Sequence, residues 1–456
     1  MQFLQSESII SFTVHRTEII FFRKIGQRNF LNRTPFCVND QQKKTYAIKS
    51  EKNSDRISEL RDTLGVKIND KAHKNEITEI CDLITKFQKV FEQTEQLSCI
   101  KEVPITTVEG KAEFVRQHPI PHKFKEGLKN EISKMLKMGI IESCSNPRGW
   151  NSPILPVRKK NGEIRLCANF KRTINIHLSE SSDKYQLPVT EPLFQQIGKN
   201  NYFASFDVRS SYWQLKIREQ DRFKTAFQFE NQCYNFIRLP YGLKNSGDLF
   251  CRTISDCFKD VKNNEFIKHF VDDILCHTKT FEEYKLAITE IFQICLKYNI
   301  CLNGSKCSFL FDTTKFLGRI IKPDGFSADP DNINGILEMN PPRTRRELQQ
   351  CLGRYNWLRA FLSANIGEEV AENCFSSLIK ELTLLNKNNV KFVWNQKAQF
   401  AFDNMKSRLS SEKVITFADF SKPFCLVTDA SKIACAGILL QNIDNQQKII
   451  AVVSKL

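Results

Sequence analysis

Two adjacent aspartates, Asp272 and Asp273, stand in the otherwise apolar stretch KHFVDDILCH, residues 268–277. Successive side chains of a strand point to opposite faces, so both carboxylates reach one ligand only near a strand end or in a tight turn. A buried carboxylate also needs a cation or a hydrogen-bond partner, and a divalent metal ion supplies that charge. The alternative is a hairpin turn with two solvated aspartates, so the pair alone leaves both readings open.

A third carboxylate is needed for phosphoryl transfer by two metal ions. The segment FASFDVRSSYWQL provides it, because Asp207 ends an apolar run and is followed by polar residues and an aromatic residue, Tyr212. The alternative is an aspartate that caps a strand-to-turn transition, which is a common arrangement.

The elements that must position these carboxylates begin with a helix and two hairpins. Apolar residues at helical spacing predict one buried helix face, which ends at Gly139; the face comprises Phe124, Leu128, Ile132, Met135 and Leu136. The segment SPILPVRKKNGEIRLCANF reads as a hairpin with a turn at Asn161-Gly162. TAFQFENQCYNFIRLP reads as a second hairpin.

The paired aspartates precede a second helix, TFEEYKLAITEIFQICLKYNI, which starts with a capping box of Thr280 and Glu283. KFLGRIIKPDGFSADP then predicts a hairpin with its turn at Pro323-Asp324-Gly325. Residues 330–405 read mainly as helix, and strands return from residue 414. Helices and strands mix without strict alternation, which favours an α+β fold.

Composition sets the class of protein and of partner. A chain of 456 residues predicts two to four domains. Its 16 cysteines include no C-x-x-C pair, so they read as reduced thiols of an intracellular, cytoplasmic or nuclear, protein. No apolar run approaches the roughly 18 residues that span a bilayer, so no membrane partner is expected. The net charge of +16 favours a polyanionic partner, although a solvated basic surface accounts for it equally well.

The order of these motifs resembles the Pol polyprotein of gypsy-class LTR retrotransposons: a reverse transcriptase followed by the start of an RNase H-like domain. The resemblance runs from about residue 100 to the end of the sequence. The segments that carry it are MLKMGIIESCSNPRGWNSPILPVRKKNGEIRLCANFKRTIN, YQLPVTEPLFQQIGKNNYFASFDVRSSYWQLKI, FKTAFQFENQCYNFIRLPYGLKNSGDLFCR, FVDDILCHTKTFEEY, LNGSKCSFLFDTTKFLGRII, LQQCLGRYNWLRAFL, FVWNQKAQFAFDNMK and PFCLVTDASKIACAGILLQ.

The resemblance implies a right-hand polymerase with fingers, palm and thumb, and an RNA-directed DNA polymerase activity. Asp207, Asp272 and Asp273 would be the catalytic residues and the ligands of two Mg²⁺ ions, with Mn²⁺ as an alternative. The partners would be an RNA or DNA template with its primer, and dNTPs. The residues expected to bind the dNTP are Lys159, Lys160, Arg165, Tyr212, Tyr241 and Gly242.

Several of the residues that match the family also have an ordinary structural explanation. Lys159, Lys160 and Arg165 could belong to an exposed basic hairpin, and Tyr212 could be a core tyrosine. Phe316, Leu317 and Gly318, which match the primer-positioning hairpin of the family, could be core residues and a turn. Arg343, Arg345 and Arg346 are candidates for contact with the nucleic-acid backbone, and a solvated helix start explains them as well.

The chain departs from the family pattern at several positions. Asn169 stands where the family usually has Asp, Trp213 where it has His, Cys251 where it has Gln and Phe270 where it has Tyr. Asp248 adds a negative charge near an expected template contact. These changes motivate the main alternative, a catalytically decayed, retroelement-derived nucleic-acid-binding protein. A second alternative is another two-metal enzyme such as a nuclease, and the ordered motifs argue against it.

The domains expected are an unassigned basic leader (residues 1–75), reverse transcriptase fingers and palm (76–325), a mainly helical thumb and connection (326–410) and a truncated RNase H-like part (411–456). In that last part LVTDAS resembles the first RNase H strand, with Asp429 as the lone residual metal ligand. Since a two-metal RNase H site needs a cluster of carboxylates, we expect no RNase H activity from these residues.

Overall fold

The structure is a computed structural model that describes residues 53–92, 99–159, 162–179, 185, 190–362, 375–409, 414–432 and 434–455. The described residues fall into two compact units, one within Asn39–Asp329 and the other within Pro330–Leu456. Each unit is described by itself.

A five-stranded sheet forms the centre of the first unit, in the order β1-β12-β6-β11-β10. Its strands are β1 (Lys67–Ile68), β6 (Tyr202–Asp207), β10 (Ile267–Phe270), β11 (Asp273–Thr278) and β12 (Ser308–Phe311). β1 runs parallel to β12, and the other neighbours are antiparallel. Residues far apart in the sequence thus meet at the ends of β6 and β11.

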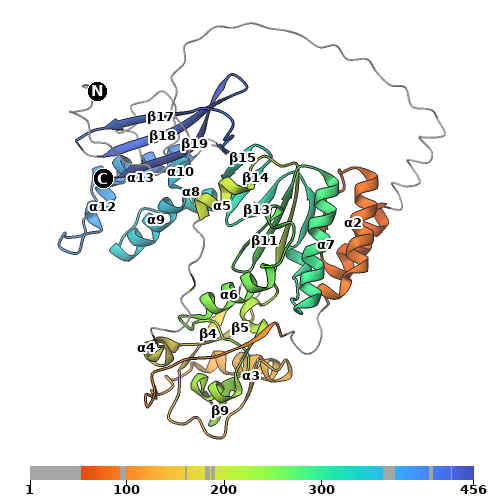
Figure 1. Cartoon of the computed structure of the whole chain (residues 1–456). Helices are drawn as coiled ribbons and strands as arrows, with labels where there is room; N and C mark the ends of the chain where they lie inside the picture. Colours follow the sequence, from red (N-terminus) through yellow and green to blue (C-terminus); the bar gives the residue numbers. More distant parts are fainter. Residues whose placement is uncertain are drawn as a thin grey trace. The chain divides into compact units, whose positions relative to one another are not determined.

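Helices cover this sheet and enclose an aromatic core. α7 (Phe281–Lys297) packs on β11 and β6, and α2 (Lys74–Lys86) packs on α7, as Figure 1 shows. Between them the ring centroids of Phe206 lie 5.9 Å from Phe292 and 5.4 Å from Phe309. Such aromatic contacts stabilise the core beyond their buried area, so the strand that ends in Asp207 is firmly anchored.

The predicted capping box of α7 is confirmed. The Thr280 hydroxyl accepts a hydrogen bond from the Glu283 amide, and the Glu283 carboxylate accepts one from the Thr280 amide. Because α7 starts just after β11, this cap fixes where the sheet strand ends and the covering helix begins.

A second group of elements in this unit carries the predicted hairpins. Its members are α3 (His122–Lys137), β3 (Ile141–Ser143), β4 (Ile154–Arg158), β5 (Ile164–Ala168), α4 (Ile174–His177), β8 (Phe227–Phe229), β9 (Gln232–Phe236) and α6 (Ser246–Phe258). β4 pairs with β5, and β9 pairs with both β3 and β8. Both hairpin predictions are therefore confirmed; Asn161 in the first turn lies outside the described residues.

The predicted apolar face of α3 is confirmed at its centre, whereas Phe124 in its first turn is only partly buried. Leu128, Ile132 and Met135 are buried, and the chain leaves the helix at Gly139 with a φ of 62°. Leu136 is 38% exposed, so its assignment to the buried face was wrong. Met135 already points to the core, and the next residue is turned by about 100° around the helix axis.

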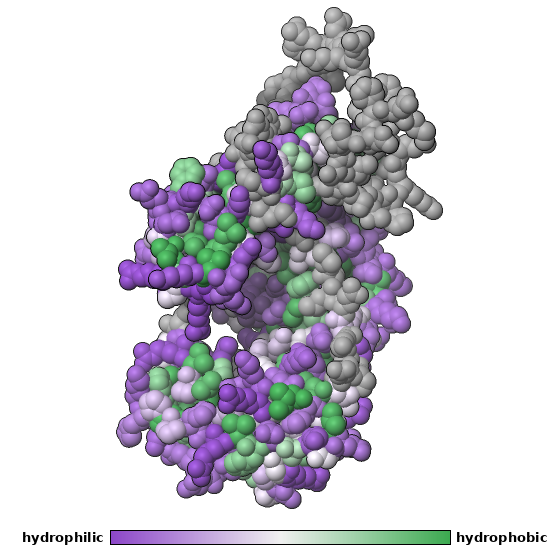
Figure 2. Space-filling model, turned by 90° about the vertical axis from the view of Figure 1, so that its left-hand side faces the viewer, coloured by the Kyte–Doolittle hydropathy of each residue, from purple (hydrophilic) through white to green (hydrophobic). Residues whose placement is uncertain are grey.

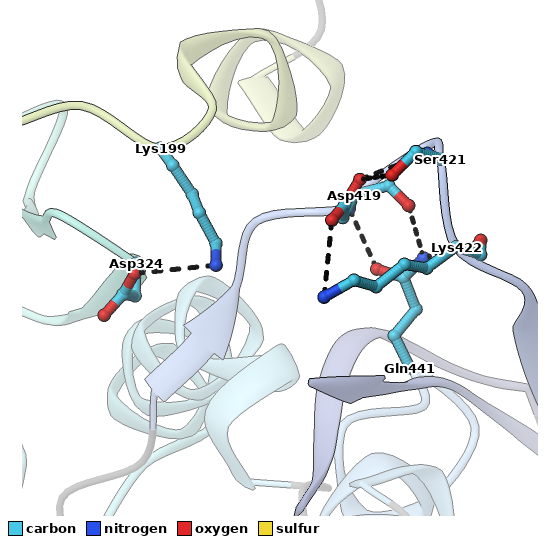
Figure 3. Close-up of polar contacts among 6 residues, drawn as sticks. All are labelled: Lys199, Asp324, Asp419, Ser421, Lys422 and Gln441. Carbon is cyan, nitrogen blue, oxygen red and sulfur yellow. Dashed lines mark hydrogen bonds and ion pairs between the residues drawn. The ribbon is translucent and has the colours of Figure 1, made fainter. Parts of the chain in front are cut away.

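Further short elements complete the first unit. They are β2 (Lys101–Val103), β7 (Leu215–Ile217), α5 (Thr190–Ile197), β13 (Thr314–Phe316), β14 (Arg319–Lys322), β15 (Gly325–Ala328) and the 3₁₀ turns η1 (Gln88–Val90), η2 (Phe170–Arg172), η3 (Ser211–Gln214), η4 (Glu219–Thr225), η5 (Asn264–Phe266) and η6 (Gly304–Lys306). The β14–β15 hairpin turns at Pro323-Asp324 as predicted, since Lys322 pairs with Gly325. Figure 3 shows Lys199 beside this turn, with its Nζ 3.9 Å from Asp324 Oδ1.

The last part of the expected leader is folded into this unit. Residues 53–64 are helical, and β1 joins the central sheet beside β12. Residues 1–52 lie outside the described residues. The division into four domains stays a prediction.

The second unit is helical and then a sheet, as predicted for residues 330–405 and from 414. Its helices are α8 (Pro330–Leu337), α9 (Arg345–Trp357), α10 (Arg359–Leu362), α11 (Phe375–Leu378), α12 (Lys380–Leu385) and α13 (Gln396–Leu409). Its strands are β16 (Val414–Thr416), β17 (Phe424–Ala430), β18 (Cys435–Ile443) and β19 (Gln446–Lys455), of which the last three form an antiparallel sheet.

A buried glutamine anchors the turn before this sheet (Figure 3). The Gln441 side chain accepts a hydrogen bond from the Asp419 amide (2.9 Å) and donates to the carbonyls of Asp419 (2.8 Å) and Lys422 (3.2 Å). The Asp419 carboxylate in turn accepts from the Ser421 hydroxyl at 2.6 Å. The turn that leads into β17 is therefore fixed by side chains.

The prediction of a mixed α+β fold is confirmed. None of the described helices has both the length and the apolar character to cross a membrane. Hydrophilic residues cover most of the coloured face in Figure 2, and apolar residues appear there in small groups.

Candidate active site

The three predicted aspartates meet at one end of the central sheet. Asp273 opens β11 and lies directly opposite Asp207, the last residue of β6. Residues directly opposite on antiparallel strands carry their side chains on the same face. Asp272 occupies the preceding turn, where its carbonyl accepts a hydrogen bond from the Val208 amide at 2.9 Å.

The turn that carries Asp272 is conformationally strained. Phe270 pairs with Asp273, so Val271 and Asp272 alone connect β10 to β11. Val271 has a φ of 55°, in the left-handed region that β-branched residues rarely adopt. Such strain costs on the order of 1–3 kcal/mol and persists where the surroundings dictate it. Because Asp272 lies in this turn and Asp273 begins β11, their side chains do not follow the alternation of a straight β-strand.

A lysine from a third segment joins the aspartates. Lys306, at the end of η6, places its Nζ 3.0 Å from Oδ1 of Asp207. The Asn303 amide donates to the carbonyl of the same aspartate at 2.8 Å. The hydrogen bond from Lys306 to the Asp207 carboxylate raises the pKa of Lys306, which stays an ammonium.

Burial and, to a lesser degree, neighbouring like charges shift the pKa values of Asp272 and Asp273 upward. Burial raises the pKa of Asp273 to about 6, and the charges of Asp272 and Asp207 add to the effect. Burial likewise raises the pKa of Asp272, with a further contribution from Asp207. Lys306 opposes both shifts. Carboxyls that resist ionisation in this way are suited to a bound cation.

The donor set fits a divalent metal ion in kind, because Mg²⁺ prefers carboxylate oxygens. As the side chains stand, however, no three His, Cys, Asp or Glu residues of the described chain are arranged around one metal position. Asp207 is instead turned to Lys306. The assignment of the three aspartates as metal ligands stays a prediction.

A cavity of about 430 Å³ opens beside Asp207 and Asp272. It brings together Lys159 and Arg165 from the β4–β5 hairpin with Tyr241, all of them predicted dNTP contacts. The other lining residues are Glu131, Lys134, Met135, Met138, Ile140, Val208, Arg209, Ser210, Ser211, Trp213, Asn303 and Lys306. Carboxylates and cations in one cavity suit a ligand that carries both a metal ion and phosphates.

The basic residues of the hairpin differ in their present contacts. Lys159 Nζ lies 3.0 Å from Glu163 Oε2 on the same hairpin. The Arg165 guanidinium lies 6.0 Å from the ring centroid of Tyr241. Lys160 lies outside the described residues. Of the two described cations, Arg165 is the one that lies near the Tyr241 ring.

The aromatic wall of the cavity is Tyr241, and Tyr212 packs behind it with the ring centroids 5.0 Å apart. Tyr212 also packs edge-on against Phe250 at 5.6 Å, and it does not line the cavity itself. Gly242 follows Tyr241 with a φ of 97°, and a Cβ there would come within 3.3 Å of the Ala168 carbonyl oxygen. Only glycine accommodates this turn, which holds Tyr241 in place.

Other predicted positions lie outside this cavity. Leu317 and Gly318 form a tight turn between β13 and β14, since Phe316 pairs with Arg319. In the second unit, the Arg345 guanidinium donates to the backbone carbonyls of Asn388 and Val390, which favours a structural role.

The remaining predicted metal ligand, Asp429, lies on β17 opposite Ala436. The roles assigned to these positions from the resemblance stay predictions.

The departures from the family pattern have local explanations. The Asn169 side chain caps η2 by accepting a hydrogen bond from the Lys171 amide at 3.2 Å. Asp248 lies in the first turn of α6, where the helix dipole stabilises a negative charge. Cys251 is buried in the same helix. The fold therefore accommodates these residues.

Sequence reasoning missed three basic residues of the cavity. Lys306, Arg209 and Lys134 line it beside the predicted positions. Arg209 follows Asp207 by two residues, so its proximity was available from the sequence. Lys306 and Lys134 come from other segments, and only the pairing of β12 with β6 and the packing of α3 bring them near.

Comparison with known families agrees with the expected polymerase. Residues 157–321 match the family model described as reverse transcriptase (RNA-dependent DNA polymerase). Residues 394–456 match that of an RNase H-like domain found in reverse transcriptase.

The curated relatives are polyproteins of transposons. The chain is 30% identical over 349 residues to the retrovirus-related Pol polyprotein from transposon opus of Drosophila melanogaster, which covers 75% of this chain and 34% of the relative. It is 28% identical over 377 residues to the transposon Tf2-3 polyprotein of Schizosaccharomyces pombe, covering 81% of this chain and 27% of the relative. The chain thus spans about a third or less of these relatives.

Solved structures of the foamy viral protease-reverse transcriptase share the fold. The one in complex with double-stranded DNA has a TM-score of 0.73 at 24% identity and covers 88% of this chain and 68% of that chain. The one in complex with an RNA/DNA hybrid has a TM-score of 0.71 at the same identity, with 88% and 52% covered. The expected architecture, a right-hand polymerase followed by an RNase H-like segment, is confirmed at the level of the fold.

Proposed function

We propose that this chain, which carries a reverse transcriptase domain and an RNase H-like segment as the Pol polyproteins of gypsy-class LTR retrotransposons do, is an RNA-directed DNA polymerase. Its reaction is the templated addition of a dNTP to a primer 3′ end with release of pyrophosphate. The observation that carries the proposal is the register that sets Asp273 opposite Asp207, with Asp272 in the adjoining turn.

The three aspartates are assigned the divalent ions. Asp207, Asp272 and Asp273 would hold Mg²⁺, or Mn²⁺ in its place, which when bound activates the primer hydroxyl and neutralises the triphosphate. The reverse transcriptase family is in general dependent on divalent metal. The raised pKa values of Asp272 and Asp273 support this assignment, because bound cations would relieve the repulsion among the carboxylates.

The cavity next to the aspartates is assigned the incoming dNTP. Lys159 and Arg165 would contact its phosphates, where cations stabilise the charge that develops on phosphoryl transfer. Lys160, on the same hairpin, is assigned the same role. Tyr241 and Gly242 would form the pocket wall, and Tyr212 would exclude a 2′-hydroxyl.

The nucleic-acid partner is an RNA or DNA template with its primer. The foamy viral enzymes of the same fold were solved with double-stranded DNA and with an RNA/DNA hybrid. The net charge of +16 supports such a partner. The described cysteines are all free thiols, and we assign the chain to a reducing compartment, the cytoplasm or the nucleus.

The test is primer extension on a heteropolymeric RNA template with dNTPs and Mg²⁺ or Mn²⁺. Extension by the chain, and its loss in the Asp272→Asn, Asp273→Asn variant, is the expected result. If the chain binds template in a salt-sensitive manner but extends nothing, it is the nucleic-acid-binding relic instead. Extension that survives in the variant contradicts the assignment of the paired aspartates. RNA degradation without dNTPs would point to a nuclease.

A further inference from the structure

Two cysteines face each other across the β3–β9 ladder, away from the candidate active site. Ser143 of β3 pairs with Tyr234 of β9, and one further step along this register sets Cys144 opposite Cys233. The Cys144 amide donates to the Cys233 carbonyl at 2.8 Å, so the pairing continues through the two cysteines. They are far apart in the sequence and adjacent in the sheet.

The backbone spacing at this point suits a disulfide. Directly opposite residues in a hydrogen-bonded antiparallel pair have Cα atoms about 5.5 Å apart. Disulfides usually span Cα separations of about 4.4–6.8 Å. Because Cys144 and Cys233 lie directly opposite each other on antiparallel strands, both side chains project from the same face of the ladder. The register of β3 and β9 therefore meets the backbone requirement for a disulfide.

The two thiols differ in how readily they react. Burial raises the pKa of Cys233 to about 12, and the neighbouring Cys144 adds to that effect. Both cysteines are half-buried, whereas seven of the described cysteines, Cys81, Cys251, Cys257, Cys276, Cys295, Cys307 and Cys351, are fully buried. Cys144 also lines an open cavity, so it is the thiol that a reagent reaches first.

That cavity, of about 860 Å³, is rich in arginine. Arg148 and Arg218 line it with exposed side chains, and Arg148 lies over the ring of Phe223 at 4.6 Å. A third arginine, Arg222, is paired with Glu142 at 3.3 Å. Arg148 and Arg218 together outweigh the remaining acidic lining residue, Glu219, so the surface beside Cys144 carries a net positive charge that attracts anionic small molecules.

We propose that Cys144 and Cys233 are a redox-active dithiol that is oxidised to a disulfide by anionic low-molecular-weight disulfides of the glutathione type. The Cys144 thiolate attacks one sulfur of the reagent and releases one glutathione thiolate, which leaves a mixed disulfide. Cys233 loses its proton to water, and its sulfur attacks the Cys144 sulfur and releases the second glutathione. Two protein thiols are oxidised to one disulfide, and one glutathione disulfide is reduced to two thiols.

The disulfide would connect two segments that lead to the polymerase cavity. β3 follows α3, which contributes Lys134 to that cavity, and β9 leads to Tyr241. A covalent link between β3 and β9 restricts the unfolded chain and the relative motion of both segments. The Cys144–Cys233 pair would therefore be a reversible cross-link between β3 and β9, the strands that lead to the polymerase cavity.

The first test maps thiols on the full chain after incubation with oxidised glutathione. Free thiols are blocked with N-ethylmaleimide under denaturing conditions, and the peptides are analysed by mass spectrometry. We expect a Cys144–Cys233 cross-linked peptide two hydrogens lighter than the sum of its parts, which dithiothreitol separates. The proposal is overturned if both cysteines are found alkylated at a ratio of oxidised to reduced glutathione at which the exposed Cys425 is already oxidised.

Single variants test the order of the two steps. In Cys233→Ser the mixed disulfide of Cys144 with glutathione should accumulate, because no second thiol resolves it. In Cys144→Ser, Cys233 should remain alkylatable. Cys425→Ser, in the other unit, is the matched control and should form the Cys144–Cys233 link like the unaltered chain. Equal glutathionylation of Cys233 in Cys144→Ser would contradict the assigned order.

The arginines are tested with two reagents of different charge. In Arg148→Gln, Arg218→Gln, oxidation by glutathione disulfide should slow by on the order of tenfold. Oxidation by the neutral hydroxyethyl disulfide should keep its rate. A variant that slows equally with both reagents, or with neither, would show that the arginines do not recruit the reagent.

Discussion

Lys306 donates a hydrogen bond of 3.0 Å from its Nζ to Oδ1 of Asp207, the carboxylate that lies opposite Asp273. In the proposed function a metal ion binds this same carboxylate, so the Lys306 ammonium and the metal ion compete for it. The ammonium and the metal ion repel each other, so Asp207 binds each of them more weakly when the other is present.

Replacement of Lys306 should expose this competition. In Lys306→Met we expect Mg²⁺ to raise the melting temperature more than in the unaltered chain, because Asp207 is free to bind the ion. Without Mg²⁺ the variant should lose only about 0.5 kcal/mol, since the lysine is 62% exposed. Thermal unfolding with and without Mg²⁺ measures both effects. The control is Lys285→Met, which breaks ion pairs with Glu79 and Glu282 elsewhere; an equal Mg²⁺ shift in both variants would refute the competition.

The raised pKa of Asp273 predicts a pH-dependent stability. The folded pKa is about 6 against an ordinary value of 3.8, so the folded state binds more protons than the unfolded state between these values. Stability should therefore fall as pH rises from about 4 to 6, by about 3 kcal/mol for a shift of about two units. Asp273→Asn should remove most of this fall and be more stable than the parent at pH 7.5 without divalent metal. Urea unfolding across this range checks it, and parallel curves for both proteins would contradict it.

Arg165 should contribute to dNTP binding more than its neighbours do. Loss of one charged contact to a phosphate costs about 1.5–3 kcal/mol, so Arg165→Gln should raise the KM for dNTP by on the order of tenfold or more. Arg158→Gln is the matched control, because Arg158 is exposed on the paired strand and does not line the cavity. Steady-state primer extension gives both values. Equal KM values for the two variants would remove Arg165 from the site.

Tyr212 should affect the choice of sugar. Its ring is held between Tyr241 and Phe250, so truncation in Tyr212→Val opens space without removing a charge. We expect ribonucleotide incorporation to rise relative to deoxyribonucleotide by on the order of tenfold, the scale of steric discrimination in a pocket. Single-nucleotide extension with matched dNTP and rNTP measures the ratio. The control is Phe250→Leu, which loosens the packing behind the ring and should change the ratio far less.

The sequence predicted the elements of the site better than their contacts. Asp207, Asp272 and Asp273 stood out because carboxylates in apolar runs need a partner, and the capping box of Thr280 and Glu283 is a local signal. Local sequence patterns, however, do not tell which strands pair with each other or in which register. The Lys306 contact with Asp207 and the pairing of Cys144 with Cys233 depend on which strands become neighbours.

Side-chain pairs on the surface were equally hidden from the sequence. Lys159 was expected at the triphosphate, and in the structure its ammonium is paired with Glu163 four residues on. Leu136 shows a second limit of the sequence pattern. Helical spacing groups the apolar residues on one side of α3, but it does not tell which residue at the edge of that side is exposed.

Val271 gives the aspartate turn a property that bears on how the sequence can change over time. Its φ of 55° suits glycine or asparagine far better than valine. A glycine would relax the backbone, yet it would also allow Asp272 many orientations that valine forbids. Substitutions that stabilise the fold at position 271 should therefore loosen the placement of Asp272, so fold stability and the proposed activity make opposite demands on this one residue.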